Sequence, residues 1–369
     1  MQPFTNSKAV RKYRSNYSHF DETEIASHFD KAHSAVVIPI RKESVKTVHD
    51  CLFHLDNAAA YKKISCCSIL VVNGPEEERH IHREFISFID AESSRKKFPS
   101  LQLVILDRST EGRWFGPKDG VGLARKIGFD FAFEHIVRAR VSSPWVRSLD
   151  ADTFVPCDYF QEFQNRTGMY LYEFLHDTSQ LDATHAEALK IYDQYLRYYQ
   201  RGLTAAGSPF NFLAFGSNIA IHAETYAEVR GFPQLQAGED FYLMNKVAKM
   251  KQVYGARDRE ALRIIGRLSD RVPFGTGPAI MKYVREIENG GRILFPHPAL
   301  FLTLKTFLEN LESLAEARPS LIPEIFDGLR TRQFLTDAEL SHHPAIPYQE
   351  ALNLASELWE STPLMSPAI

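Results

Sequence analysis

The 369-residue chain has few cysteines and no large excess of charge of either sign, and these absences exclude several classes of protein. Its 43 Lys and Arg against 46 Asp and Glu give a formal net charge of −3, which argues against the broad basic surface that nucleic-acid binding requires. The four cysteines, including the adjacent Cys66 and Cys67, form neither a disulfide framework nor a zinc pattern. We expect all four to be reduced core residues.

Long apolar runs are also absent. No segment approaches the roughly 20 apolar residues that cross a bilayer, so we expect no transmembrane segment. The basic N-terminal stretch lacks the apolar run of a secretion signal, and we therefore expect a cytoplasmic protein. With 44% hydrophobic residues the chain can bury a substantial core, and its length fits one catalytic unit with an elaboration.

Strands and helices are predicted to alternate over the first 150 residues. Continuous apolar runs rich in β-branched residues indicate strands that are buried on both faces. The predicted strands are 35–40, 68–72, 101–106 and 145–149. The predicted helices follow Ser44, follow Pro75 and span about 123–138. This order predicts an α/β fold with a mostly parallel sheet, whose ligand site lies at the carboxyl ends of its strands.

The second half of the sequence is less regular. We predict helices at 182–200 and 239–250, an extended segment at 213–221, and a largely helical chain beyond Pro296. The Tyr-rich stretch 192–199 either stacks on an acceptor or faces the core. The C-terminal region either closes the acceptor side or forms the contact of a homodimer.

Two carboxylates, those of Asp150 and Asp152, are predicted to close the fourth strand. Residues separated by one position on a strand project to the same side, so both carboxylates can face one ion. Oxygen ligands suit Mg²⁺ or Mn²⁺, which keep open positions for substrate phosphates. A D-x-D pair alone also fits two solvated carboxylates in a turn.

Four segments stand in order along the chain. They are 36–43 (VVIPIRKE), 120–128 (GVGLARKIG), 148–153 (SLDADT) and 216–220 (GSNIA), the last followed by 231–232 (GF) and 238–240 (GED). Together, over roughly 36–277, they resemble the family-2 glycosyltransferases with the GT-A fold. The resemblance implies a mixed, mostly parallel sheet flanked by helices, with a helical C-terminal extension.

The resemblance also implies an activity: transfer of a sugar, of the hexosyl type, from a UDP- or GDP-linked donor to a hydroxyl acceptor, with Mn²⁺ or Mg²⁺. Asp152 and Asp150 are the expected metal ligands. Asp240 and Glu239 form the expected catalytic pair, and Asp240 is preferred as general base if the reaction inverts the anomeric configuration. The structural alternative is that the two carboxylates only cap a helix. The residues expected to contact the donor are Pro39, Arg41, Glu43, Asn73, Gly122, Arg125, Asp150, Ala151 and Arg271.

Some positions depart from the family pattern or stay ambiguous. Asn73 stands where many relatives carry an aspartate near the base, so the base stays open. A third metal ligand has no clear counterpart, and Ser269, a water or His297 are the alternatives. Arg125 pairs with the diphosphate or with Asp152, or is an exposed surface arginine.

We divide the chain into a leader (1–33), a nucleotide-sugar-binding half (34–155), an acceptor-binding half (156–295) and a helical extension (296–369). Within the third part, 267–277 combines two arginines with glycines, which suits either a lid that orders over the diphosphate or a fixed surface loop.

Two other functions compete. A sugar-phosphate nucleotidyltransferase usually carries a Gly-rich loop after the first strand, whereas 38–43 contains no glycine. A non-catalytic nucleotide-sugar-binding protein of the same fold would not need the four carboxylates at 150, 152, 239 and 240.

Overall fold

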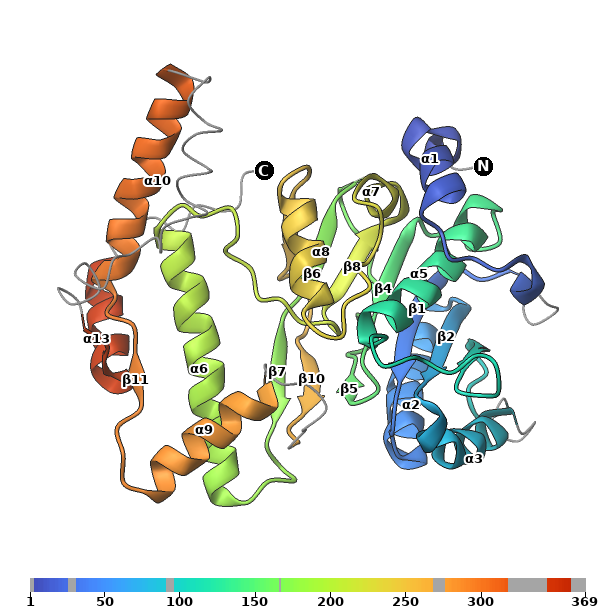
Figure 1. Ribbon diagram of the computed structural model, residues 1–369, viewed down its shortest axis with the longest axis horizontal. Coiled ribbons are helices and arrows are strands. Elements are labelled where there is room, and N and C mark those ends of the chain that lie inside the picture. The colour runs from blue at the N-terminus through green and yellow to red at the C-terminus, as the bar shows by residue number, and fades with distance from the viewer. Residues whose placement is uncertain are drawn as a thin grey trace. The chain divides into compact units, whose positions relative to one another are not determined.

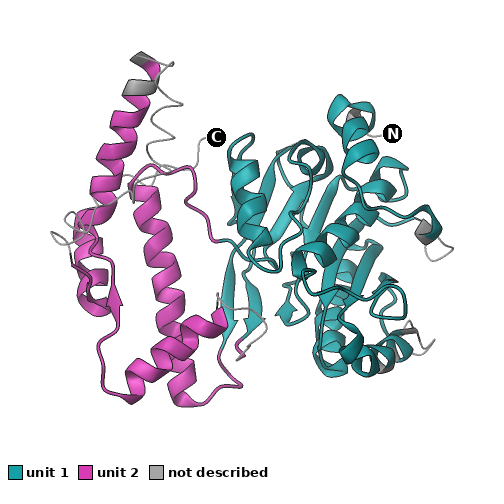
Figure 2. Ribbon diagram, in the orientation of Figure 1, with its two compact units in different colours: residues 1–177, 214–265 teal, residues 178–213, 266–369 magenta. Residues whose placement is uncertain are grey.

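The structure is a computed structural model that describes residues 3–25, 31–90, 96–165, 167–267, 276–317 and 344–359. The chain divides into two compact units (Figure 2). Unit 1 comprises Met1–Asp177 and Ala214–Ile265, and unit 2 comprises Thr178–Leu213 and Gly266–Ile369. These units differ from the predicted segments 156–295 and 296–369, because 178–213 packs with the C-terminal helices. Which unit binds donor or acceptor stays a prediction.

Unit 1 is built on a seven-stranded sheet in the order β3-β2-β1-β4-β8-β6-β9. The strands are β1 (Ser34–Ile40), β2 (Cys66–Asn73), β3 (Leu101–Arg108), β4 (Trp145–Ser148), β6 (Met169–Tyr172), β8 (Ile219–His222) and β9 (Val253–Ala256). β1 pairs in parallel with β2 and β4, and β2 with β3, whereas β8 runs antiparallel to β4 and β6. The mixed, mostly parallel sheet and its first four strands are confirmed.

Helices flank this sheet (Figure 1). They are α1 (Lys8–Asn16), α2 (Val45–Lys62), α3 (Arg79–Asp90), α5 (Val121–Val137), α7 (Ala223–Glu228) and α8 (Glu239–Ala248). Ser44 caps α2 by accepting a hydrogen bond from the Thr47 N–H at 3.0 Å, as predicted. α5 packs closely against β1 and β2. The absence of a side chain at Gly128 allows this approach, because a Cβ there would collide with Val37. A smaller sheet pairs β5 (Thr153–Phe154), β10 (Leu262–Ile265) and β7 (Phe174–Asp177).

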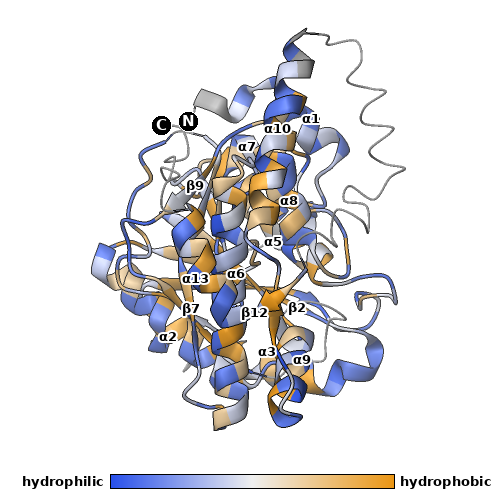
Figure 3. Ribbon diagram, turned by 90° about the vertical axis from the view of Figure 1, so that its left-hand side faces the viewer, coloured by the Kyte–Doolittle hydropathy of each residue, from blue (hydrophilic) through white to orange (hydrophobic). Residues whose placement is uncertain are grey.

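Unit 2 is mainly helical. Its elements are α6 (Ala183–Ala205), α9 (Thr276–Glu288), α10 (Ala299–Ala317), α13 (Tyr348–Trp359) and a short pair of strands, β11 (Leu294–Phe295) and β12 (Ile346–Pro347). α6 contacts α9, α10 and α13, and it carries both hydrophobic and hydrophilic residues (Figure 3). Tyr198 of α6 is buried, with its ring centroid 5.3 Å from that of Phe295 and 5.2 Å from that of Trp359. The core-facing alternative is therefore correct for Tyr198, and the helical character beyond Pro296 is confirmed over the described residues.

Two expectations need correction. The predicted extended segment 213–221 is wrong over most of its length, because β8 begins only at Ile219 and residues 214–218 are irregular. All four cysteines are free, but Cys157 is exposed in a turn that follows β5, so it is not a core residue. Among the described residues, no helix combines the length and apolar composition needed to cross a bilayer.

A buried carboxylate fixes the N-terminal helix to α5. Asp130 of α5 is completely buried. Its Oδ1 accepts hydrogen bonds from the hydroxyls of Tyr13 at 2.5 Å and Tyr226 at 2.9 Å. Its Oδ2 accepts from Lys126 Nζ at 3.1 Å and from the His19 N–H at 2.7 Å. Because Tyr13 belongs to α1, this network ties the expected leader to the sheet-covering helix α5.

The substitution Asp130→Asn is expected to lower the free energy of unfolding by about 3 kcal/mol, the usual scale for breaking a buried ion pair. The asparagine leaves the Lys126 ammonium buried without its negative partner and points an amide N–H₂ at other donors. Tyr13→Phe removes two hydrogen bonds, the one donated to Asp130 and the one accepted from Lys126 Nζ, and should cost about 2 kcal/mol. Urea unfolding of the full chain measures both values, and a loss for Asp130→Asn no larger than that for Tyr13→Phe would contradict the prediction.

Candidate active site

The two carboxylates of the D-x-D pair lie in a turn that follows β4. The Thr153 N–H donates to the Asp150 carbonyl at 3.0 Å, and β4 already ends at Ser148, so the prediction that both aspartates extend a strand is wrong. Burial nevertheless alternates, since Ala151 is buried whereas Asp150 and Asp152 are partly exposed. The turn therefore still presents two carboxylates at the carboxyl end of a central strand, where open α/β sheets bind ligands.

Arg125 is the centre of the ion pairs around this turn. Its side chain is only 4% exposed, which excludes the surface-arginine alternative. The guanidinium donates from Nη2 to Asp150 Oδ1 at 2.5 Å, from Nε to Ser148 Oγ at 3.2 Å, and from Nη1 to Glu239. Its aspartate partner is thus Asp150, where the sequence suggested Asp152. Burial lowers the pKa of Arg125, but the two carboxylates outweigh it and hold that pKa above its usual value.

Gly216 completes the surroundings of Arg125. A Cβ at Gly216 would collide with the guanidinium of Arg125, so only glycine allows the backbone to approach this closely. Ser148 and Asp150 belong to the third segment of the sequence resemblance, Gly216 to the fourth and Glu239 to its downstream part. Arg125, which belongs to the second, therefore contacts each of these.

Gly122 positions the chain that leads to the acidic pair. A Cβ at Gly122 would lie 2.5 Å from the Leu235 carbonyl oxygen and 2.6 Å from that of Pro233. The Gly122 N–H also donates to the Leu235 oxygen at 3.1 Å. These contacts give Gly122 a packing role that the sequence did not predict, whereas its donor contact stays a prediction.

The acidic pair begins helix α8, as predicted. Gly238 precedes it with φ 76°, a left-handed conformation that favours glycine. Glu239 is 2% exposed and paired with Arg125, whereas Asp240 is partly exposed and accepts from the Phe241 N–H at 2.7 Å. The two members are thus not equivalent: one is enclosed by protein and the other faces solvent.

Burial raises the pKa of Glu239 to about 7. Arg125 opposes this shift, while the negative charges of Asp240 and Asp150 add to it. Burial therefore sets the net direction of the shift, and the opposing effect of Arg125, whose guanidinium also binds Asp150, is smaller.

Asp150 and Asp152 are the side chains that the sequence assigns to a divalent cation, and their role as metal ligands stays a prediction. The buried thiol of Cys51 lies near both aspartates: its pKa is raised by burial first, then by the charges of Asp152 and Asp150. Within the described ranges, no three His, Cys, Asp or Glu side chains are grouped to hold a metal. Mg²⁺ or Mn²⁺ suits such a site, because these ions take one or two carboxylates and fill their remaining positions with water and phosphate oxygens.

The basic residues after β1 have an acidic partner that the sequence reading missed. Arg41 donates to Glu78 from Nη2 at 2.9 Å, and Lys42 Nζ lies 2.9 Å from the same carboxylate. Burial raises the pKa of Glu78, but the hydrogen bonds from these two cations lower it to about 2. The sequence assigned Glu78 only to the first turn of a helix, which here is a 3₁₀ turn before α3. Arg41 and Glu78 are 37 positions apart, so no local pattern in the sequence signals this contact.

Other expected donor contacts are placed as follows. The buried Asn73 amide donates to the carbonyls of Ile40 at 3.2 Å and Val71 at 3.0 Å, so it ties the ends of β1 and β2 together, and a contact with the base stays a prediction. Pro39 lies on β1 and Glu43 is buried just beyond it. Arg271, Ser269 and most of the expected lid lie outside the described residues.

No protein-family model and no curated protein matches the chain. Similar solved structures include S. aureus TarS 1-349 in complex with UDP, at 12% identity and a TM-score of 0.42, covering 78% of this chain and 73% of that one. Another is the mannosyltransferase PcManGT from Pyrobaculum calidifontis in complex with GDP-Man and Mn²⁺, at 12% identity and a TM-score of 0.39, covering 84% and 89%. Two further TarS structures are matched over 60% and 37% of their own lengths. Similarity at this sequence identity and TM-score concerns the arrangement of helices and strands alone.

The raised pKa of Glu239 predicts a pH-dependent effect of Glu239→Gln on stability. Between its ordinary pKa of 4.5 and about 7, the native state keeps a proton that the unfolded chain releases. The stabilising contribution of Glu239 is therefore complete below pH 4.5 and is lost as the pH rises through about 7. Glutamine stays neutral, so the variant should gain stability relative to the parent between about pH 5 and about pH 8.

Glu134→Gln is the matched control on α5. Burial raises the pKa of Glu134, but hydrogen bonds from Arg14 and Arg138 bring it below the ordinary value, so its stabilising contribution is lost only in more acidic solution. Urea unfolding at several pH values should give a flat difference for Glu134→Gln and a rising one for Glu239→Gln. If the difference in unfolding free energy between variant and parent does not change with pH for either variant, Glu239 is fully ionised at neutral pH and the prediction fails.

Proposed function

We propose that this protein is a metal-dependent glycosyltransferase that moves a sugar from a UDP- or GDP-linked donor to a hydroxyl acceptor. The observation that carries the proposal is the convergence on Arg125. Its guanidinium contacts Ser148, Asp150, Glu239 and the backbone at Gly216, which come from sequence segments up to 114 positions away from it. Chain segments that resemble family-2 glycosyltransferases one by one are therefore also neighbours in space.

The donor end of the proposed site is the turn at Asp150 and Asp152. These two carboxylates would hold Mg²⁺ or Mn²⁺, which when bound stabilises the negative charge on the departing diphosphate. Arg125 orients the Asp150 carboxylate, while 37% of that side chain remains exposed. The Arg125 guanidinium binds both Asp150 and Glu239, so it holds the Asp150 carboxylate in place without covering it.

The acceptor end is Asp240. In an inverting reaction, the bond between the anomeric carbon and the phosphate oxygen breaks, the bond to the acceptor oxygen forms, and the acceptor proton passes to the base. Asp240 suits that role because it is partly exposed at the start of α8, where it is also favoured by the helix dipole. Glu239 is a positioning residue, because it is enclosed and bound to Arg125.

The nucleotidyltransferase alternative gains no support from the basic pair after β1. Both Arg41 and Lys42 bind Glu78. Each of the two cations is therefore already paired with a carboxylate, whereas a triphosphate cradle needs unpaired donors. Release of UDP or GDP from nucleotide sugars in the presence of Mn²⁺ tests the proposed activity directly and separates it from a binding protein that does not turn over.

Asp152→Asn is expected to abolish metal-dependent binding of the nucleoside diphosphate, because the amide removes the negative charge that a hard cation needs. Calorimetric titration of UDP and GDP, with Mn²⁺ and with chelator, measures this. Asp21→Asn, at an exposed position in the same unit, is the control and should bind like the parent. Equal affinity of the parent protein with metal and with chelator would refute metal dependence.

Asp240→Asn should leave donor affinity near the parent value and reduce transfer by about 100-fold or more, the usual scale for loss of a general base. The comparison of kcat with nucleotide-sugar affinity separates this from a folding defect. If transfer by Asp240→Asn stays at the parent rate, Asp240 is only a helix-terminal residue.

A further inference from the structure

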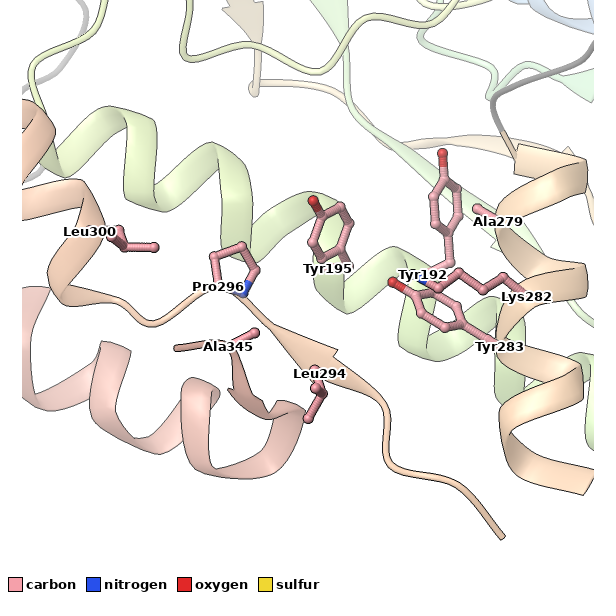
Figure 4. A pocket seen from close by; sticks show the side chains of 9 residues that line it. All are labelled: Tyr192, Tyr195, Ala279, Lys282, Tyr283, Leu294, Pro296, Leu300 and Ala345. Atoms are coloured by element: carbon pink, nitrogen blue, oxygen red, sulfur yellow. The ribbon is translucent and has the colours of Figure 1, made fainter. Parts of the chain in front are cut away.

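Unit 2 contains a pocket of about 500 Å³ that no step of the proposed reaction uses (Figure 4). Pockets of a few hundred cubic ångströms are the usual size for small-molecule sites. Its lining residues are Tyr192, Tyr195, Ala279, Lys282, Tyr283, Leu294, Pro296, Leu300 and Ala345. All of them belong to unit 2, so the pocket is formed within one compact body.

Aromatic rings from two helices form part of its wall. Tyr192 and Tyr195 are three positions apart on α6 and so share one face of that helix, and Tyr283 comes from α9 (Figure 4). Tyr192 is hydrogen-bonded to Thr276. In contrast, the hydroxyls of Tyr195 and Tyr283 make no hydrogen bond to any other described residue. Two phenol groups are thus available to a ligand.

Lys282 is the one charged residue among those that line the pocket. Within the described part of the chain it forms no ion pair, and the lining contributes no acid. Lys282 and Tyr283 both come from α9, and Figure 4 shows their side chains next to each other at one side of the pocket. The charge of the pocket therefore favours an anionic ligand.

We propose that this pocket binds a sugar that carries a phosphate or carboxylate group. Aromatic faces pack against the C–H surface of a sugar ring, the two phenols exchange hydrogen bonds with its hydroxyls, and Lys282 pairs with its anion. A purely hydrocarbon ligand would cover three polar groups without satisfying them, which is unfavourable. This binding does not depend on the proposed glycosyltransferase activity.

The test is calorimetric titration of the full chain with glucose 6-phosphate, glucuronate, glucose and octyl glucoside. At least one anionic sugar should bind about tenfold or more tightly than glucose, a difference that a single charge-assisted contact can supply. The phosphate and carboxylate probes distinguish which anion is preferred. Lys282→Ala should remove the preference for the anion, and Tyr195→Phe should weaken both anionic and neutral sugars.

Lys190→Ala is the matched control, because Lys190 is an exposed lysine of the same unit that does not line the pocket. Equal binding of charged and neutral sugars, tighter binding of octyl glucoside, or equal behaviour of the two lysine variants would overturn the proposal. Titration of UDP and GDP with Mn²⁺ on the same samples distinguishes the pocket proposal from the glycosyltransferase proposal. If the nucleotide binds and the sugar probes do not, only the pocket assignment fails; if the reverse holds, the glycosyltransferase proposal fails.

Discussion

The ion pairs of Arg125 with Asp150 and Glu239 determine how the rest of the candidate site is arranged. A guanidinium that is 4% exposed has lost most of its water, and this desolvation is tolerated only because two carboxylates and a hydroxyl replace the solvent. The partners lie on different elements, one in the turn after β4 and the other at the start of α8. Their common contact with one cation therefore holds the turn after β4 and the start of α8 at a fixed separation.

Helix α5 links this arrangement to the rest of unit 1. Arg125 faces the site, while Asp130 and Glu134 on the same helix bind Tyr13 and Arg14 of α1. Two glycines of the helix allow close packing. The backbone of 233–235 lies against Gly122, and the Val37 and Val71 side chains of the sheet lie against Gly128. A single helix thus contacts the N-terminal segment, the sheet and the acidic pair. A shift of α5 would therefore change the packing at all three.

The first four strands could be predicted from sequence because local composition is sufficient for them. Runs such as 35–40 and 68–72 are apolar and β-branched throughout, and only a strand covered on both faces suits that pattern. The D-x-D turn was misjudged as strand because an alternating exposure of side chains does not require extended hydrogen bonding. The ion-pair partners of Arg125 could not be predicted from the sequence, because contacts between residues 25 and 114 positions apart depend on the tertiary fold. Glu78 was overlooked for the same reason.

The interleaved course of the chain has a consequence for its biosynthesis. Helix α6 belongs to unit 2, yet it is translated before the second part of unit 1 and well before α9, α10 and α13, which cover it. While the ribosome adds the intervening residues, the apolar face of α6 around Tyr198 has no native partner. Exposed surfaces of this kind are prone to aggregation and are typical chaperone ligands. The C-terminal helices are therefore not a removable appendage, because a nascent or truncated chain without them leaves a hydrophobic helix uncovered in the middle of the sequence.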